Sequence, residues 1–251
     1  MQYHSAGLTD VGQRRKLNED AFLVDDELGL YVVADGMGGH AAGEIASEQA
    51  VETVHGMVIR GHAALDRVAQ GDTSEDSLRQ AIRVVESAVQ AATYMVFGLA
   101  QHDPNQQGMG TTVAVLARCG DYGSTAQVGD SRIYLIRGLE AESLTEDHTL
   151  VAWQLKQGII TEAEAERSPH RNVITRAVGS REYVQVDTGF FEVRPSDAYL
   201  LCSDGLHGYL RDEEIPAVIQ MGPKGAAERF IAMANSRGGR DNITAVVVNV
   251  R

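Results

Sequence analysis

The stretch YVVADGMGGHAAGE, Tyr31 to Glu44, joins an apolar run to a carboxylate, a glycine-rich turn and a histidine. The apolar run is typical of a buried strand, so Asp35 is expected where that strand ends and can point into a cleft. The glycines that follow allow positive φ and let the backbone approach a ligand closely. A single Asp-Gly pair most often marks only a turn, so a functional reading of this stretch depends on the rest of the chain.

Length and composition restrict the class of protein. The chain has 251 residues, 43% of them apolar, which is enough for a sizeable core in one large domain or two small ones. Its formal net charge of -13 argues against a protein that binds nucleic-acid phosphates or an anionic membrane surface. Some of its 35 carboxylates could instead line a cation site, which composition does not decide.

The two cysteines, Cys119 and Cys202, lie in or beside apolar runs and have no CxxC spacing. Buried reduced thiols are therefore expected, with a disulfide as the alternative. No signal-peptide pattern follows Met1, and no apolar run approaches the roughly 18 residues of a membrane span. These features predict a cytoplasmic protein.

Hydrophobic periodicity predicts a chain rich in short strands, interrupted by two long helices early and two shorter ones late. Strands are expected at 3–8, 21–24, 28–34, 183–193, 199–202 and 243–250, with an antiparallel meander in 110–144. Helices are expected at 43–60, along an apolar stripe from 78 to 99, and at 150–157, 162–166, 212–221 and 225–234. Thr73 or Ser74 could cap the second helix. The pattern indicates antiparallel sheet with helices on its outer faces, in one sheet or two.

Carboxylates lie at the edges of four apolar runs. Asp35, Asp130 and Asp204 follow such runs, Asp241 precedes one, and the NED segment at 18–20 adds two more acids. Like charges gathered in a partly desolvated cleft repel one another unless cations neutralise them. Oxygen ligands favour Mg²⁺ or Mn²⁺ over Zn²⁺. A two-metal site of this kind can bind phosphoryl oxygens and activate water, which is a hydrolase design.

Seven motifs together resemble the metal-dependent Ser/Thr protein phosphatases of type 2C, the PPM family, in their compact bacterial form. They occur in family order over nearly the whole chain: DVGQRRKLNED (10–20), ADGMGGHAAGE (34–44), GMGTT (108–112), VGDSR (128–132), RNVITRAVG (171–179), LCSDGL (201–206) and GRDNITAVVV (239–248). The resemblance implies an α+β fold, a four-layer α-β-β-α sandwich of two antiparallel sheets flanked by helices. It implies one catalytic domain over 1–251, with a subdomain at roughly 147–179 that we call the flap.

The resemblance also implies a metal-ligand set. Asp35 would bridge two ions, Mn²⁺ or Mg²⁺, and the carbonyl of Gly36 would bind one of them. Asp204 and Asp241 would complete the shell of the other.

Three further acids have lesser roles in this set. Glu19 matches the acid that reaches a metal directly or through water, and Asp20 is the expected partner behind it. Asp130 matches the acid that helps to hold a weaker third metal; the alternative is an ordinary hairpin-turn aspartate.

Two side chains would act on the substrate. Arg15 fits the phosphate-binding arginine, because a planar guanidinium can hold two phosphate oxygens; Arg14 is its competitor, and either could simply face solvent. His40 fits the general acid that protonates the leaving alkoxide, although a loop histidine is more often only exposed.

Two departures from the family pattern affect the site. His207 and Gly208 follow SDGL where many relatives have an acidic or other polar residue, so the behaviour of that loop is open. The middle of the flap is individual to this chain and could bias the choice of substrate.

These observations predict a monomeric, cytoplasmic protein-serine/threonine phosphatase that acts without a phosphoenzyme intermediate. The resemblance implies that its partners are phosphorylated proteins, a bacterial Ser/Thr kinase and that kinase's substrates; no nucleic acid and no membrane are expected. The alternative is a non-catalytic phosphoprotein-binding regulator of the same fold, although such proteins usually lose their metal aspartates. A nucleotide-binding enzyme is disfavoured, because no GxxxxGK[ST] motif occurs.

Overall fold

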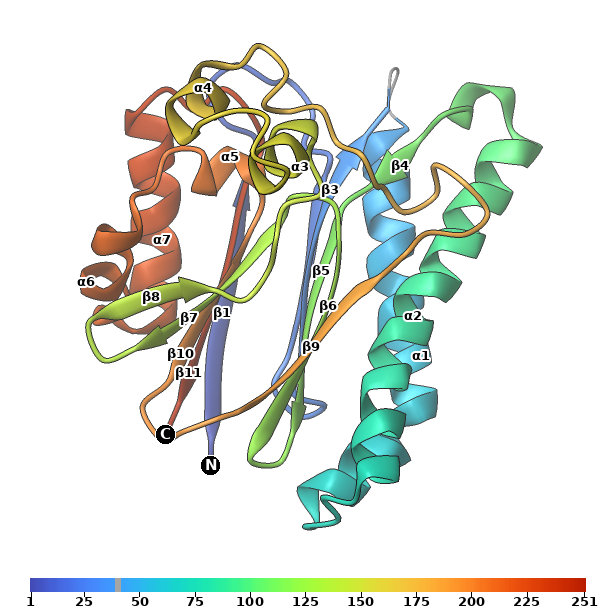
Figure 1. The fold of residues 1–251 in the computed structure, drawn as a ribbon, viewed down its shortest axis with the longest axis vertical. Coiled ribbons are helices and arrows are strands. Elements are labelled where there is room, and N and C mark those ends of the chain that lie inside the picture. The colour runs from blue at the N-terminus through green and yellow to red at the C-terminus, as the bar shows by residue number, and fades with distance from the viewer. Residues whose placement is uncertain (39–41) are drawn as a thin grey trace.

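The computed structural model describes residues 1–38 and 42–251, with the backbone only at Glu166, and contains two antiparallel sheets packed face to face (Figure 1). Sheet A has the order β1 (Tyr3–Asp10), β11 (Ile243–Val250), β10 (Ala198–Cys202), β7 (Arg132–Arg137) and β8 (Glu140–Ser143). Sheet B has the order β2 (Asp20–Asp25), β3 (Leu30–Met37), β5 (Val113–Cys119), β6 (Tyr122–Val128) and β9 (Asp187–Glu192), with β4 (Gly110–Thr111) paired to the end of β3.

Helices cover the outer face of each sheet. Two long antiparallel helices, α1 (Gly43–Ala69) and α2 (Glu75–His102), lie on sheet B. The short helices α5 (Asp204–His207) and α6 (Ile215–Ile219) and the longer α7 (Gly222–Ser236) lie on sheet A. Short 3-10 turns, η1 (Pro104–Gln106) and η2 (Asp212–Glu214), precede β4 and α6. The expected four-layer α+β sandwich is confirmed.

Alternation along the strands explains why four layers form, since successive side chains of a strand point to opposite faces. On β3, Leu30, Val32 and Ala34 pack against α1 and α2, whereas Tyr31 and Val33 pack between the sheets. On β11, alternate residues divide in the same way between the α7 layer and the space between the sheets. Strands buried on both faces read as continuous apolar runs, which is why periodicity alone left the number of sheets open.

The long helices extend beyond the expected ranges. The first continues to Ala69, about two turns past the expected end, and the second begins after Ser74, whose hydroxyl accepts a hydrogen bond from the N–H of Ser77. Ser74 is thus the N-cap, as one of the two expected alternatives. The expected strand 183–193 forms only over Asp187–Glu192.

The expected meander in 110–144 is wrong in one respect. β5 and β6 form a hairpin in sheet B, but β7 and β8 form theirs in sheet A. The chain crosses from one sheet to the other between Val128 and Arg132, where Gly129 has φ +103°, a conformation that favours glycine. The crossing carries Asp130 to the end of the sandwich where β3 also ends.

The flap lies at the same end of the sandwich, opposite both chain termini (Figure 1). It contains α3 (Leu150–Lys156), capped by Thr149, and α4 (Glu162–Arg167), which Thr161 and Glu164 cap reciprocally. Backbone hydrogen bonds join its two ends: Leu150 N–H to Val173 O at 2.8 Å, and Thr175 N–H to His148 O at 2.7 Å.

Two expectations about the whole chain can be compared with the structure. Cys119 and Cys202 are both buried and free, so the reduced thiols are confirmed. Over residues 1–38 and 42–251, no helix is both long and apolar enough to cross a membrane.

Candidate active site

Five aspartates from separate elements meet at one end of the sandwich. Asp35 lies within β3, which continues to Met37 rather than ending at Ala34 as expected. The others come from the start of β2, the β6–β7 crossing, the start of α5 and the residues before β11: Asp20, Asp130, Asp204 and Asp241. All four raise the pKa of Asp35 through their charge.

Asp35 is held by its backbone. Its N–H donates to the hydroxyl of Thr112 at 3.0 Å, and its carbonyl accepts from the N–H of Thr112 and the hydroxyl of Thr111, both at 2.9 Å. Burial raises the pKa of its carboxyl well above the ordinary value, and the charges of Asp20 and Asp204 raise it further. A carboxylate in this position is stabilised by a cation.

Asp20 is buried directly behind this carboxyl, opposite Asp35 in the β2–β3 pair. Its Oδ2 accepts hydrogen bonds from Ser203 Oγ at 2.8 Å and Thr244 Oγ1 at 2.6 Å. Its Oδ1 has no hydrogen-bond partner among the described residues. Burial raises the pKa of Asp20 to about 7, although the two hydroxyls act in the opposite direction. The residue therefore ties β2 to β11 and to Ser203, which joins β10 to α5, and keeps one oxygen available.

The carboxyls of Asp204 and Asp130 are also desolvated. Burial raises both pKa values, that of Asp130 to about 7, and neighbouring aspartates raise them further. His207, one turn after Asp204 in α5, contacts the main-chain carbonyl of Asp130 through Nε2 at 3.0 Å. Since a carbonyl only accepts, Nε2 carries the proton. Burial lowers the pKa of His207 to about 4, so this link is a neutral imidazole joining the two loops.

Arg15 forms an ion pair with Asp241, its Nη2 lying 2.7 Å from Oδ2. The loop that carries Arg15 is anchored by the side chain of Asn242, which accepts from the N–H of Glu19 at 2.8 Å and donates to the carbonyls of Val11 and Leu17. Arg15, rather than Arg14, thus reaches the aspartate cluster in this structure.

Glu19 and Gly36 lie where the backbone segments at Glu19, Gly36 and Gly43 come into contact. A Cβ added to Gly36 would lie 2.0 Å from the carbonyl oxygen of Gly43 and 2.6 Å from that of Glu19. A Cβ on Gly43 would lie 2.2 Å from Glu19 Oε1. Only glycine fits at position 36, where backbone atoms leave no room for a Cβ, whereas a Cβ at position 43 would meet the end of the Glu19 side chain. The Glu19 carboxylate therefore rests directly against the start of α1. Burial raises its pKa, and the charge of Arg15 partly offsets the shift.

The donors fit a hard divalent cation. They are all oxygen atoms, their carboxyls are desolvated, and Asp20 keeps a buried oxygen without a partner. In the described part of the chain, however, no three His, Cys, Asp or Glu side chains already form a group that could hold one ion. Asp241 accepts from Arg15 at Oδ2 and from the N–H of Asn242 at Oδ1, so a metal that used Asp35, Asp204 and Asp241 together would share the Asp241 carboxylate with these donors.

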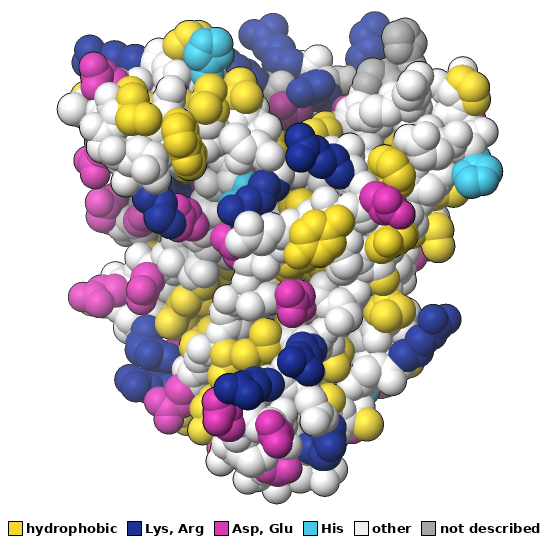
Figure 2. Space-filling model, turned by 45° about the vertical axis from the view of Figure 1, so that its right-hand side comes forward, with side chains coloured by type: hydrophobic (Ala, Val, Ile, Leu, Met, Phe, Trp, Pro, Cys, Tyr) yellow, Lys and Arg dark blue, Asp and Glu magenta, His cyan; other side chains and the backbone are white. Residues whose placement is uncertain are grey.

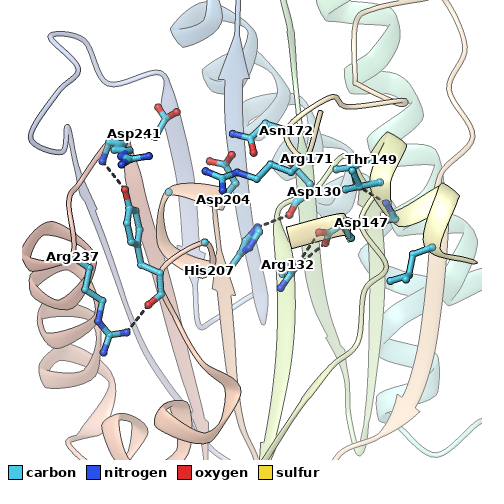
Figure 3. A pocket seen from close by; sticks show the side chains of 18 residues that line it. Asp130, Arg132, Asp147, Thr149, Arg171, Asn172, Asp204, His207, Arg237 and Asp241 are labelled. Atoms are coloured by element: carbon cyan, nitrogen blue, oxygen red, sulfur yellow. Dashed lines mark hydrogen bonds and ion pairs between the residues drawn. The ribbon is translucent and has the colours of Figure 1, made fainter. Parts of the chain in front are cut away.

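The aspartates open into a pocket of about 760 Å³ beneath the flap (Figure 3). Asp130, Asp204 and Asp241 lie along one side of it, and Arg171 and Asn172 extend into it from the flap. His40, the expected general acid, falls outside the described residues.

Three residues that hold this site together were not among the expected site residues: Thr112, His207 as a hydrogen-bond donor, and Asn242. Each fixes the backbone or loop of a candidate ligand, namely Asp35, Asp130 and Glu19. Thr112 and Asn242 stand inside motifs quoted above, GMGTT and GRDNIT, and His207 was noted only as a departure. Position within the motifs was thus the available signal for Thr112 and Asn242.

Comparison with known proteins finds chains of similar sequence and fold. Residues 12–241 match the family model described as protein phosphatase 2C. The protein phosphatase PhpP of Streptococcus pneumoniae is 37% identical over 248 residues, covering 97% of this chain and 96% of that protein. The crystal structure of the Mycobacterium tuberculosis serine/threonine phosphatase PstP/Ppp matches with a TM-score of 0.86 and 34% identity, over 100% of both chains. The PstP catalytic domain in complex with two manganese ions matches with a TM-score of 0.81 and 32% identity, over 99% of this chain and 98% of that one.

Proposed function

Because this chain belongs to the protein phosphatase 2C family, we propose that its aspartate pocket is the active site of a metal-dependent protein-serine/threonine phosphatase. The observation that carries the proposal is the convergence of four carboxylates on Asp35 in a fold shared with PstP. The family and its manganese-bound member support dependence on a divalent metal. We propose Mn²⁺ or Mg²⁺, two per site, with a third held through Asp130.

The ligand assignments follow the positions described above. Asp35 would bridge the two ions, the carbonyl of Gly36 would serve one, and Asp204 and Asp241 the other. When bound, the ions would supply positive charge for the phosphoryl oxygens and activate the attacking water. Glu19 lies beside Gly36 and Gly43, where it would bind directly or through water.

The chain's own side chains complete the proposed chemistry. Asp20 supports the site from behind, because its bonds to Ser203 and Thr244 fix the ends of three strands around Asp35. Arg15 would bind the substrate phosphate with its planar guanidinium once Asp241 is engaged by a cation. We retain His40 as the proposed proton donor to the leaving serine or threonine oxygen.

We propose a single catalytic domain over residues 1–251 with the flap at 147–179, acting as a monomer on phosphorylated proteins and reversing a bacterial Ser/Thr kinase. A cytoplasmic location is supported by the two buried free cysteines, since reducing compartments preserve thiols.

The test is hydrolysis of para-nitrophenyl phosphate and a phosphothreonine peptide by the purified protein, with EDTA, Mg²⁺ or Mn²⁺, beside Asp35→Asn. Metal-dependent turnover that the variant lacks is expected. A folded wild-type protein without turnover in any metal would instead favour the non-catalytic phosphoprotein-binding regulator.

A further inference from the structure

The pocket is larger than the aspartate centre. Its volume of about 760 Å³ lies within the range that accommodates a drug-sized ligand, well beyond one phosphoryl group. From the aspartates it continues between the flap, which contributes Val151, Leu155 and Arg171, and the segment before β11, which contributes Arg240. This outer part of the pocket has room for residues that flank a phosphorylated side chain.

Four arginines line the pocket, and two of them are neutralised within the protein. Arg132 binds both oxygens of Asp147, at 2.8 and 2.7 Å, and Arg237 binds both oxygens of Glu214, at 2.8 and 2.6 Å. Arg171 and Arg240 are exposed and form no ion pair with any side chain that the structure describes. The outer pocket therefore presents two positive charges in a chain whose net charge is -13.

Arg240 is presented by an anchored backbone. Its N–H donates to the hydroxyl of Tyr209 at 3.2 Å, and the preceding Gly239 donates to Ala234 O at 3.0 Å and accepts from Gln13 N–H at 2.7 Å. The residue stands directly before Asp241, so its side chain leaves the backbone beside the aspartate centre. A substrate phosphate held there would place its neighbouring residues within reach of this guanidinium.

Arg171 is presented from the opposite wall, by a turn of the flap that extends it into the pocket (Figure 3). Its N–H donates to Ser168 O at 3.3 Å, and Val173 N–H donates to His170 O at 3.0 Å across the same turn. The flap surface nearby is apolar: Trp153, Leu155 and Ile159 are exposed, and hydrophobic side chains gather over the flap at the upper left of Figure 2. The flap thus presents, beside apolar surface, a cation that pairs with no side chain the structure describes.

The acids that line this pocket do not neutralise Arg171 and Arg240 in the metal-loaded protein. Asp147 is paired with Arg132. Asp130, Asp204 and Asp241 belong to the aspartate centre, which bound cations would neutralise. Acidic groups of a ligand would then meet Arg171 and Arg240, which form no ion pair with the described side chains.

We propose that Arg171 and Arg240 select phosphoserine and phosphothreonine substrates that carry an anionic side chain close to the phosphorylated residue. This inference rests on the proposed function and names the substrate class of the same site. The shared chemistry is an anion held by a charge-assisted hydrogen bond from a guanidinium. Its source is either a carboxylate of Asp or Glu or a second phosphate, and peptides can distinguish the two.

The experiment compares kcat/KM for a set of phosphothreonine peptides that differ only in the flanking residues. The reference peptide has neutral residues on both sides of the phosphothreonine. In the others, Glu or Lys replaces the neutral residue on one side or the other, or a second phosphothreonine is added. The wild type should favour the anionic peptides over the neutral one, and added salt should reduce this preference. Arg171→Gln and Arg240→Gln should each reduce it by roughly threefold to tenfold, and Arg240→Glu should favour the Lys peptides.

Arg229→Gln is the matched control, since it also removes an exposed positive charge, but from α7 and outside the pocket. It should leave the preference unchanged. An equal loss on neutral and anionic peptides, or a wild type that does not prefer anionic flanks, overturns the inference while the phosphatase activity stands. If the wild type turns over no phosphopeptide, the proposed function fails, and the Kd values of the same peptides for the Mn²⁺-loaded protein then test the charge preference by itself.

Discussion

Asp20 and Asp35 face each other directly across the β2–β3 pair, so two desolvated carboxyls occupy neighbouring positions on the same face of sheet B. Like charges in this arrangement destabilise a sheet, and burial raises both pKa values. Hydroxyls of Ser203 and Thr244 donate to one oxygen of Asp20, whereas the other has no hydrogen-bond partner in the part of the chain that the structure describes. The stability of the fold therefore depends on the proton or cation that neutralises the carboxyls of Asp20 and Asp35.

Asp35→Asn tests this dependence. Removing a buried charge should leave the metal-free protein at least as stable as the wild type, because less repulsion remains in the cluster. Turnover should fall at least about 100-fold, and the rise in Tm produced by Mn²⁺ should largely disappear. Differential scanning fluorimetry with EDTA or Mn²⁺ measures both states, with the exposed Asp121→Asn as the control. An undiminished Mn²⁺ response in Asp35→Asn would contradict the ligand role.

Asp130→Asn predicts a pH dependence. Folding raises the pKa of Asp130 from 3.8 to about 7. Between pH 4 and pH 7, Asp130 is therefore protonated in the folded protein but ionised in the unfolded chain. Stability of the metal-free wild type should therefore fall as pH rises from about 4 to about 7, by up to about 1.4 kcal/mol per pH unit for this group, and level off above. The variant lacks this contribution.

Urea unfolding in EDTA at several pH values measures the difference between the two proteins. Asp130→Asn should be more stable than the wild type at pH 8, with an advantage that shrinks towards pH 4. A difference of the same size at every pH would show that the effect comes from packing rather than from ionisation.

Arg15→Ala separates substrate binding from metal binding. The KM for a phosphothreonine peptide should rise about tenfold, because a charge-assisted contact to phosphate is lost. Affinity for Mn²⁺ should stay the same or improve, since Arg15 no longer competes for Asp241 Oδ2. Steady-state kinetics and metal titration measure the two effects, with Arg14→Ala as the neighbouring control. Unchanged KM in Arg15→Ala, or an equal rise in Arg14→Ala, argues against the assignment.

Gly36→Ala and Gly56→Ala form a matched pair. At Gly36 the new methyl group would lie 2.0 Å from Gly43 O, so the variant should lose about 2 kcal/mol or more of its free energy of unfolding. At Gly56, within α1, nothing lies within 4 Å, and the same substitution should stabilise the protein by roughly 0.5 to 1 kcal/mol. Urea unfolding with EDTA present compares them without a contribution from metal. Similar stability changes in both variants would refute the close backbone contact at Gly36.

Asp187→Asn tests how the flap is held. His148 accepts from Gly129 N–H at Nδ1, 3.1 Å away, so its proton lies on Nε2 and is donated to Asp187 Oδ2 at 3.0 Å. Arg176 donates to the other oxygen of Asp187 at 2.7 Å. His148 and Arg176 stand at the two ends of the flap, and Asp187 at the start of β9 joins them.

Without the Asp187 charge, the flap should be cleaved faster by proteases, and kcat/KM should fall more for phosphopeptides than for para-nitrophenyl phosphate. Limited proteolysis followed by mass spectrometry locates the cleavage. Glu192→Gln, at the other end of β9, removes a charge whose ion pair with Arg194 is exposed and should leave both readouts unchanged. Equal effects on the peptide and the small substrate would assign Asp187 to the chemistry instead of the flap.

The local sequence pattern predicted the bounds of an element where successive residues of the segment share the same kind of environment. The strand at 243–250 was predicted to the residue, because ITAVVVNV has no competing turn or helix signal. The start of α2 was predicted from its cap residues. The end of β3 was not, because Asp35 and Gly36 read as a turn by local chemistry, while pairing with β2 and β4 keeps them in the strand.

The amino-acid sequence by itself determined the family, the α+β class and the identities of the acids, because motif order and side-chain type are local properties of the chain. Only the tertiary structure decided that β6 and β7 belong to different sheets, that Arg15 engages Asp241, and that Arg171 and Arg240 face one pocket. These relationships join residues far apart in sequence. Periodicity averages over neighbouring residues and carries no information about such partners, whereas packing two sheets face to face fixes them all at once.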